Sequence, residues 1–537
     1  MNRTIILIFV ALFGLFFSIF AGVNIALGEY ETLGVYGSTA VILYFFAHGW
    51  RNVWWFAALL IFSGVIFLHS FEFNVEHLFF LMICLASLMF IVSKGAMPRP
   101  RELEIAGART VRAFVVLLLV YGLFHFLGNY GAPYSPSDYS LKSASKAYFD
   151  CFATMTAFFW LLTGPYGFYL KPHWPRTLIL IIFAALVGNV TIRANMFLQG
   201  FQAADGMSSS DVDFFSFHVP VINMFAGIYT LRHMTPIALV ILLMIATSAG
   251  WWRNNPRWLK LVVMASIGLC LVGAILSGGR ATLLFCFLMM FLVALVRRQI
   301  GLIALGCMAA TLAVIVINMF AGLINTKAPA YIARSLQLVM LEKGDAYRSI
   351  EGSQETRAAG RKAAIVEWRK DNRVFFFGRS VYRITWDDAT YINQKYGLDG
   401  FVMNAMRSGR THNLITDLLI QYGLVGCILY LTAYIVVISY YFRLWKSMPK
   451  SEPVLGSLVG AVAIYLPVVF IYQIFGANYM PSIAVLVLGI ARSHLATLRA
   501  PVIAPAPAAP VAGRFGTAAT RTRNRRGTGQ VPALPGS

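Results

Sequence analysis

Long apolar segments dominate the pattern of hydrophobic and polar positions. A membrane-spanning helix needs about 20 consecutive, mainly apolar residues. Fourteen segments of the chain approach this description, and the second, sixth and last are the weakest, so the pattern supports fourteen or twelve spans. The segments begin near Ile5, Leu33, Val53, Leu78, Ala113, Tyr148, Thr177, Thr235, Leu259, Ala281, Ile300, Leu418, Leu455 and Met480. Either even number predicts that both ends of the chain lie on one side of the membrane.

Two stretches interrupt this pattern and divide the chain into four parts. Residues 321–410 form the only extended hydrophilic segment, and the residues after 500 are rich in Pro, Ala and Gly. We therefore expect transmembrane helices over 1–320, a large loop domain over 321–410, further transmembrane helices over 411–499, and a disordered basic tail over 500–537.

The large loop carries one helical pattern. Ser353 is a suitable cap, and the helix is expected to end at Asp371-Asn372. Ala364, Ile365 and Trp368 recur at helical spacing, which predicts an apolar stripe that packs against the membrane domain. The run Phe375–Gly378 is expected to be a short buried segment closed by a turn.

Composition excludes a soluble globular protein. Charged residues make up 12% of the 537-residue chain and apolar or aromatic residues 58%, whereas soluble domains carry about 25% charged residues. The fold expected is an all-α polytopic membrane protein, with about 12–14 transmembrane helices and one large, partly helical loop on the outer face. The first apolar run, from Ile5 to Leu27, is too long for a signal peptide, and we expect a retained span there. The six cysteines show no spacing that indicates a disulfide framework or a zinc site.

The charges predict the orientation. Lys and Arg number 44 against 22 Asp and Glu, a net charge of +22. The basic clusters fall on alternate connections, as expected for the cytoplasmic face; they are Arg3, Lys94–Arg112, Lys171–Arg176, Arg253–Lys260, Arg297–Arg298 and Arg443–Lys450. Both termini are therefore predicted to be cytoplasmic, and the tail is expected to be solvated and not to bind nucleic acid.

The loop over 321–410 is predicted to lie on the outer face, and it carries 15 Lys or Arg against nine Asp or Glu. Such a long loop largely escapes the orientation rule, so its positive charge indicates an anionic ligand.

Charged residues are nearly absent from the predicted spans. His48 and His125 are the main titratable side chains within spans, and each is expected to be a hydrogen-bonded packing residue. This pattern disfavours a proton-coupled transporter, because such proteins place ionisable groups in the membrane.

Two arginines stand at the outer ends of spans. Arg193 directly follows the apolar run 178–192, and Arg280 lies at the outer turn between two spans. Each arginine has two interpretations. In the structural one, its side chain extends to the membrane surface so that the charge stays in water. In the functional one, its guanidinium binds an anion. Basic residues are normally found on the cytoplasmic side, and a guanidinium offers bidentate hydrogen bonds to a diphosphate.

A third element begins one of the last spans. His412-Asn413 is followed after nine residues by Gly423 and after two more by Gly426. The helix N-terminus favours an anion, and a histidine at the membrane surface can act as a general base. The two glycines are expected to permit close helix packing. Taken alone, His412 is equally well interpreted as a capping residue.

These features together resemble the family of bacterial O-antigen ligases and Wzy-type O-antigen polymerases. The resemblance rests on His412-Asn413 with its two spaced glycines, on Arg280 with Leu284, and on a large outer loop before the histidine. It covers roughly residues 178–440. The chain departs from the family pattern at Gly279, where serine is common, and at Gln421, where glutamate is common.

The resemblance implies an inverting, metal-independent glycosyltransferase of the bacterial inner membrane, with its site facing the periplasm. The donor would be a glycan on undecaprenyl diphosphate, and the acceptor a sugar hydroxyl of lipid A-core. His412 would act on that hydroxyl, while Arg280 and Arg193 would hold the diphosphate. Secondary candidates for anion contacts are Asn413, Arg410, Arg361 and Arg357. The sequence shows no motif for a metal or a cofactor.

Three alternatives remain open at this point. A Wzy-type polymerase would use the same donor and a lipid-linked glycan as acceptor. A protein O-glycosyltransferase of the same superfamily would use a protein. A polysaccharide or lipid transporter belongs to another class and would tolerate the loss of His412.

Overall fold

The structure is a computed structural model of the full chain. The residues that it describes are 107–127, 152–162, 168–198, 228–277, 280–327, 358–378, 413–475 and 482–499, together with parts of 52–83 and 333–344.

Helices make up almost all of the described chain. They are α3 (Trp54–Ser63), α5 (Ala108–Leu127), α7 (Trp174–Leu198), α10 (Ile228–Ala246), α11 (Ala249–Asn254), α12 (Arg257–Leu276), α13 (Arg280–Val296), α14 (Ile300–Met319), α15 (Ala321–Lys327), α18 (Asn372–Phe377), α21 (Leu414–Lys446), α22 (Pro453–Phe475) and α23 (Ser482–Arg499). Two further helical segments cover 152–162 and 358–368.

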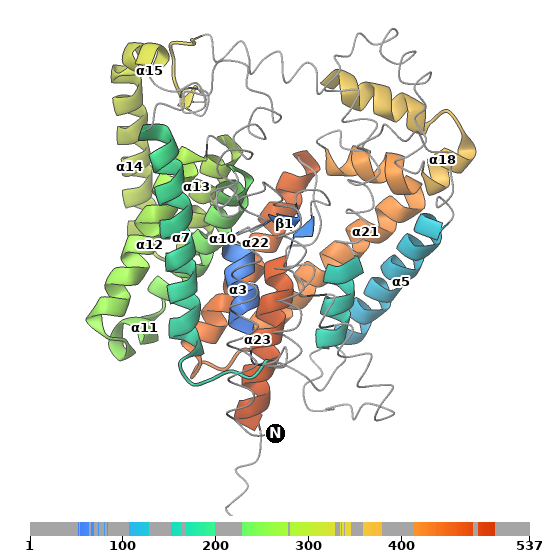
Figure 1. The fold of residues 1–537 in the computed structure, drawn as a ribbon, viewed down its shortest axis with the longest axis horizontal. Coiled ribbons are helices and arrows are strands. Elements are labelled where there is room, and N and C mark those ends of the chain that lie inside the picture. The colour runs from blue at the N-terminus through green and yellow to red at the C-terminus, as the bar shows by residue number, and fades with distance from the viewer. Residues whose placement is uncertain are drawn as a thin grey trace, which may run out of the picture.

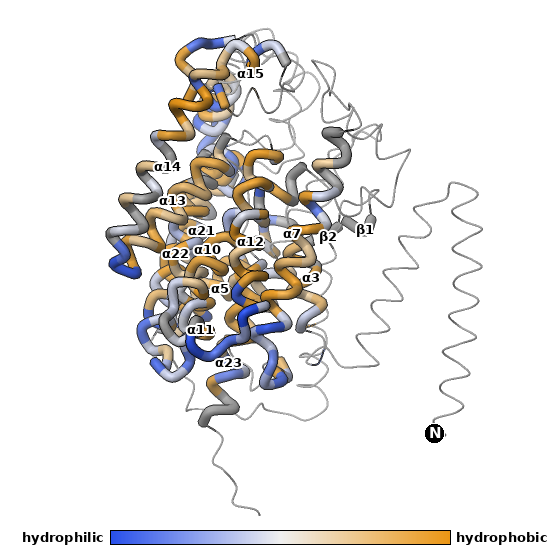
Figure 2. Tube along the Cα trace, turned by 90° about the vertical axis from the view of Figure 1, so that its left-hand side faces the viewer, coloured by the Kyte–Doolittle hydropathy of each residue, from blue (hydrophilic) through white to orange (hydrophobic). Residues whose placement is uncertain are grey.

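Five of these helices are long and apolar enough to cross a membrane: α5, α7, α12, α21 and α22. Four shorter apolar helices accompany them, at Phe152–Leu162, Met234–Ala246, Ala281–Val296 and Ser482–Leu495. Figure 2 shows the apolar residues along the middle of the helices and hydrophilic residues near their ends. The prediction of a helical multi-pass membrane protein is confirmed. The number of twelve or fourteen spans stays a prediction, because the first two predicted spans lie outside the described residues.

The span predicted near Val53 is wrong in length. Its helix, α3, ends at Ser63, and the strands β1 (Ile66–Leu68) and β2 (Phe73–Asn74) follow as an antiparallel pair. Polar residues at 69–74 interrupt the apolar run there and favour a turn over a continuing helix.

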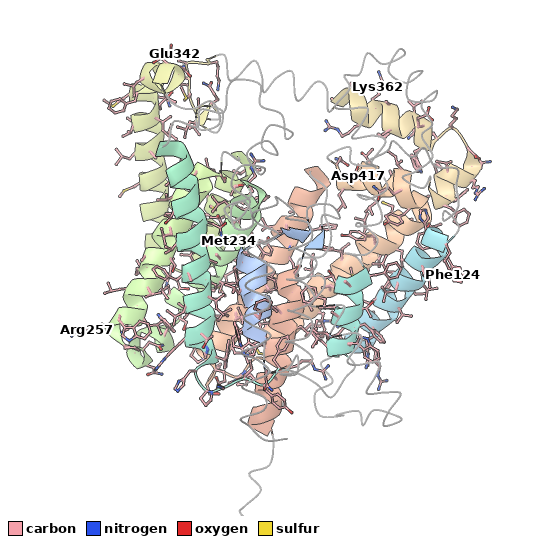
Figure 3. The ribbon with its side chains drawn as sticks, viewed as in Figure 1. Phe124, Met234, Arg257, Glu342, Lys362 and Asp417 are labelled. Carbon is pink, nitrogen blue, oxygen red and sulfur yellow. The ribbon has the colours of Figure 1, made fainter. Side chains whose placement is uncertain are left out.

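The helices have two distinct ends (Figure 1). One end, which we call the loop end, carries α15, the segment 358–368 and α18. The other, which we call the basic end, carries α11 and the beginning of α12. Figure 3 shows Arg257 at the basic end, and Glu342 and Lys362 at the loop end. The sides of the membrane on which the two ends lie stay a prediction.

Helix α10 forms the centre of one part of the membrane domain. From Met234 to Ile245 every residue is buried except Leu243. Helices α7, α12, α13 and α22 pack around it. A helix that is apolar on all sides is expected to be buried in this way.

Candidate active site

Helix α21 begins directly after the His412-Asn413 pair, as the sequence predicts. Asn413 is its N-cap, with extended backbone angles of φ −144° and ψ 115°. The side-chain Oδ1 of Asn413 accepts hydrogen bonds from the backbone N and the Oγ1 of Thr416, each at 3.0 Å. His412 itself lies outside the described residues. The prediction that a helix starts at this pair is confirmed, with Asn413 and not His412 as its cap, and the catalytic role of His412 stays a prediction.

The cap gives a test of how Asn413 acts. Both of its bonds use Oδ1 as an acceptor, so Asn413→Asp keeps them and Asn413→Ala loses them. We expect Asn413→Ala to lower the free energy of unfolding by about 0.5–2 kcal/mol and to reduce activity, whereas Asn413→Asp retains both properties. Chemical unfolding and an activity assay check this. Equal loss of activity in both variants would instead indicate that the amide NH₂ contacts the substrate.

Helix α21 is broken near its start by Gly423, whose backbone angles are φ 68° and ψ −174°. Side-chain-bearing residues avoid this conformation. A Cβ at Gly423 would collide with the backbone of Phe376 and of Gly378, and Gly378 has a positive φ of 79°. At Gly426, a Cβ would lie 2.7 Å from Cε1 of Tyr121. The prediction that both glycines permit close packing is confirmed, while the break itself was not predicted.

Helix α5 packs against the break in α21. The Tyr121 hydroxyl donates to the Tyr422 carbonyl oxygen at 2.5 Å, and His125 Nε2 lies 3.1 Å from the Phe377 carbonyl oxygen. The His125 and Tyr422 ring centroids are 5.0 Å apart. These contacts join three parts of the chain: Tyr422 and Gly423 of α21, Phe376–Gly378 at the end of α18, and Tyr121 and His125 of α5. We call this set of contacts the α21 joint. The prediction that His125 is a hydrogen-bonded packing residue is confirmed, and the joint sets the direction of residues 414–422.

The loop helices pack on the same short segment of α21. Ala363, Ala364 and Trp368 are buried in a cluster with Val374 and with Ile420 of α21. The predicted stripe is therefore confirmed at Ala364 and Trp368. It is wrong at Ile365, which is exposed because it faces away from α21.

The end of the predicted loop helix needs a further correction. The helix was predicted to end at Asp371-Asn372, but it ends at residue 368. Asp371 is instead the N-cap of the next helix, because its Oδ1 accepts a hydrogen bond from the backbone N of Arg373 at 2.9 Å. The resulting helix, α18, contains the aromatic run that was predicted to be a short buried segment. Phe376 and Phe377 are exposed, because a helix distributes three consecutive residues over more than one face. The predicted turn is confirmed at Gly378.

A buried carboxylate lies in the first turn of α21. Asp417 is 5% exposed and is the acidic residue of that turn (Figure 3). Its backbone N donates to the Asn413 carbonyl at 2.9 Å, which makes it the fourth helical residue after the cap. A buried carboxylate at the start of a membrane helix is a candidate functional group. Sequence analysis missed Asp417, although an acidic residue in the first turn of an apolar helix is a signal that could have identified it.

The predicted arginines lie at the loop ends of two helices. Arg280 is the first residue of α13, and Arg193 lies within α7; neither side chain belongs to the described part. Arg193 was predicted to follow a span, whereas the helix continues to Leu198. Of the secondary candidates, Arg361 is partly buried on the loop helix 358–368, and Arg357 and Arg410 lie outside the described residues.

A third arginine, which sequence analysis missed, lies at the same end. Arg232 of α10 donates from Nε to the Ser277 carbonyl oxygen at 3.1 Å. Ser277 ends α12, three residues before Arg280. The signal in the sequence is the same as for the other two: a basic residue at the outer end of an apolar run.

Comparison with known families identifies part of the chain. Residues 265–431 match the family described as O-Antigen ligase. The match begins within α12, includes Arg280 and the loop, and ends in α21 beyond Gly426. No curated protein matches the chain. The chain therefore carries an O-antigen ligase domain at 265–431, which confirms the resemblance over that part.

Proposed function

We propose that this protein transfers a glycan from undecaprenyl diphosphate to a hydroxyl group of lipid A-core, at the periplasmic face of a bacterial inner membrane. The observation that carries the proposal is the extent of the O-antigen ligase match. It includes both the turn that bears Arg280 and the helix that begins after His412. The structure has the α12–α13 turn and the start of α21 towards the loop end (Figure 1).

The proposed reaction is a single displacement at the anomeric carbon of the donor sugar. The acceptor hydroxyl oxygen forms a bond to that carbon, and the bond between the carbon and the diphosphate oxygen breaks. His412 takes the hydroxyl proton, and undecaprenyl diphosphate leaves with the bonding electrons. The configuration at the carbon is inverted.

The named residues divide this work among α7, α13 and the start of α21. Arg280 and Arg193 hold the diphosphate and stabilise the negative charge that grows on it as it leaves. Asp417, through its burial near the start of α21, orients the imidazole of His412 and stabilises its protonated form. The secondary candidates Arg361, Arg357 and Arg410 belong to the loop side of the site and add positive charge there. No step requires a metal.

The acceptor is tested with purified protein in lipid bilayers and labelled undecaprenyl-diphosphate oligosaccharide, with lipid A-core supplied or omitted. We expect label to move to lipid A-core, and only when lipid A-core is present. Longer lipid-linked chains without this acceptor would instead establish a polymerase. Absence of both products, under conditions in which a known ligase works, would overturn glycan transfer and leave transport as the better explanation.

A further inference from the structure

Most of α10 lies in the interior of the helix group. The helix is buried from Met234 to Ile245 apart from Leu243, and α7, α12, α13 and α22 surround it. An arginine on a lipid-facing helix can extend to the membrane surface and needs no ligand. Arg232 is only two residues from Met234, which is 3% exposed and is labelled in Figure 3. That ordinary explanation therefore does not fit Arg232.

Three arginines, each on a different helix, lie towards the loop end of this helix group. At Gly273 of α12, an added Cβ would lie 3.4 Å from side-chain atoms of Val190, Leu231 and Thr235, so α7, α10 and α12 meet there. Arg193 lies three residues after Val190, and Arg232 follows Leu231. Arg280 begins α13 after the turn that Ser277 opens. None of α7, α10, α12 and α13 contains Asp or Glu, so these four helices contribute only positive charge at this end.

Buried polar side chains lie beneath Arg232. Thr235 is fully buried and lies on the same face of α10, three residues further on. Asn189 of α7 is 3% exposed and donates to the Ala185 carbonyl at 2.8 Å. Within the described part of the chain, Thr235 Oγ1 and Asn189 Oδ1 have no hydrogen-bond partner. Buried polar groups are normally satisfied, and polar groups inside a membrane domain commonly mark a substrate site.

We propose that Arg232 is a third arginine of the diphosphate site, held in place by the Ser277 carbonyl above the polar side chains of Thr235 and Asn189. The inference rests on the proposed function, because it concerns the same donor. The bond from Nε fixes the plane of the guanidinium, and a fixed guanidinium binds a phosphate oxygen pair better than a mobile one. Three cations match the multiple charges of a diphosphate better than those of a monophosphate.

The test compares Arg232→Gln with a matched variant, Arg297→Gln. Arg297 is also a partly buried arginine that bonds to a backbone carbonyl, since its Nη2 lies 2.9 Å from the Met244 carbonyl and 2.9 Å from Ser457 Oγ. It lies at the opposite end of α10. Both variants lose a bond between helices, and only Arg232→Gln removes charge from the loop end.

Two readouts separate binding from structure. The first is the KM for the undecaprenyl-diphosphate glycan in the transfer assay. The second, which needs no turnover, is direct binding of undecaprenyl diphosphate and undecaprenyl monophosphate to the purified full chain. We expect Arg232→Gln to raise the KM and to weaken diphosphate binding about 10-fold to 100-fold, with a smaller effect on monophosphate. Arg232→Lys is expected to restore part of the affinity, and Arg297→Gln to leave both readouts unchanged.

Two results would overturn the inference. The first is diphosphate affinity and KM in Arg232→Gln equal to those of the unaltered protein. The second is an equal loss in Arg232→Gln and Arg297→Gln, which would assign Arg232 to helix packing alone. If the unaltered protein transfers no glycan, the proposed function fails, and the binding readout still tests Arg232 by itself.

Discussion

Replacement of His412 by alanine is expected to lower the rate of glycan transfer about 10²–10⁴-fold, because the reaction loses the group that accepts the hydroxyl proton. The KM for the lipid-linked donor should change little, since the arginines that hold the diphosphate lie on other helices. The measurement is the initial rate of transfer to lipid A-core in lipid bilayers, at saturating donor and with equal amounts of folded protein.

The matched control is His494→Ala. His494 pairs with Glu452, with 2.9 Å between Nε2 and Oε2, and lies 5.9 Å from the Trp174 ring. Trp174 begins α7 at the basic end, so His494 is far from the proposed site. We expect its loss to leave the transfer rate per folded molecule unchanged. A rate within threefold of normal in His412→Ala would remove His412 from the reaction.

Gly423→Ala is expected to reduce transfer about 100-fold, the loss that follows when a catalytic group is displaced by about 1 Å. Alanine at φ 68° and ψ −174° costs about 1–3 kcal/mol in backbone strain. Its methyl group would also collide with the backbone of Phe376 and Gly378. The α21 joint must open to relieve this collision, and the start of α21 then changes direction.

The matched control for this variant is Gly268→Ala in α12. Gly268 has no atom within 4 Å of an added Cβ, and alanine favours a helix over glycine by about 1 kcal/mol. We expect this control to keep its activity and to unfold at an equal or higher temperature. The checks are the thermal unfolding temperature and the transfer rate of both variants. Normal transfer by Gly423→Ala would show that the break in α21 has no role in placing the site.

The apolar runs of the sequence predicted most helices of the membrane domain, because a helix in a membrane is determined by local composition. The start of α21 was also predictable, since Asn413 is a strong cap and the apolar residues follow it. The early end of α3 was not predictable. The apolar run continues over 53–68, so its composition does not show that the helix ends at Ser63 and that a strand follows.

The details that depend on contacts between distant segments were not predictable. Gly423 has unusual backbone angles at the place where the backbone of α18 packs against it. Helix α18 lies about 45 residues earlier in the chain. A glycine inside an apolar run does not show this by itself. Arg232 was missed for a similar reason: its significance depends on Ser277, which is 45 residues away. Sequence reasoning identified Arg193 and Arg280 because each lies at the edge of a clearly apolar run, whereas Arg232 lies three residues before the run that begins at Thr235 and carries the same signal more weakly.

The α21 joint also determines how tightly the loop domain and the reaction are linked. Residues 414–422 form a short arm that pivots at Gly423, and the loop helices hold this arm through Ile420. This arm is roughly 14 Å long, so a tilt of about 4° displaces its tip by about 1 Å. A displacement of this size is enough to lower the rate of a reaction about 100-fold, so the packing of the loop helices on Ile420 belongs to the requirements of the reaction.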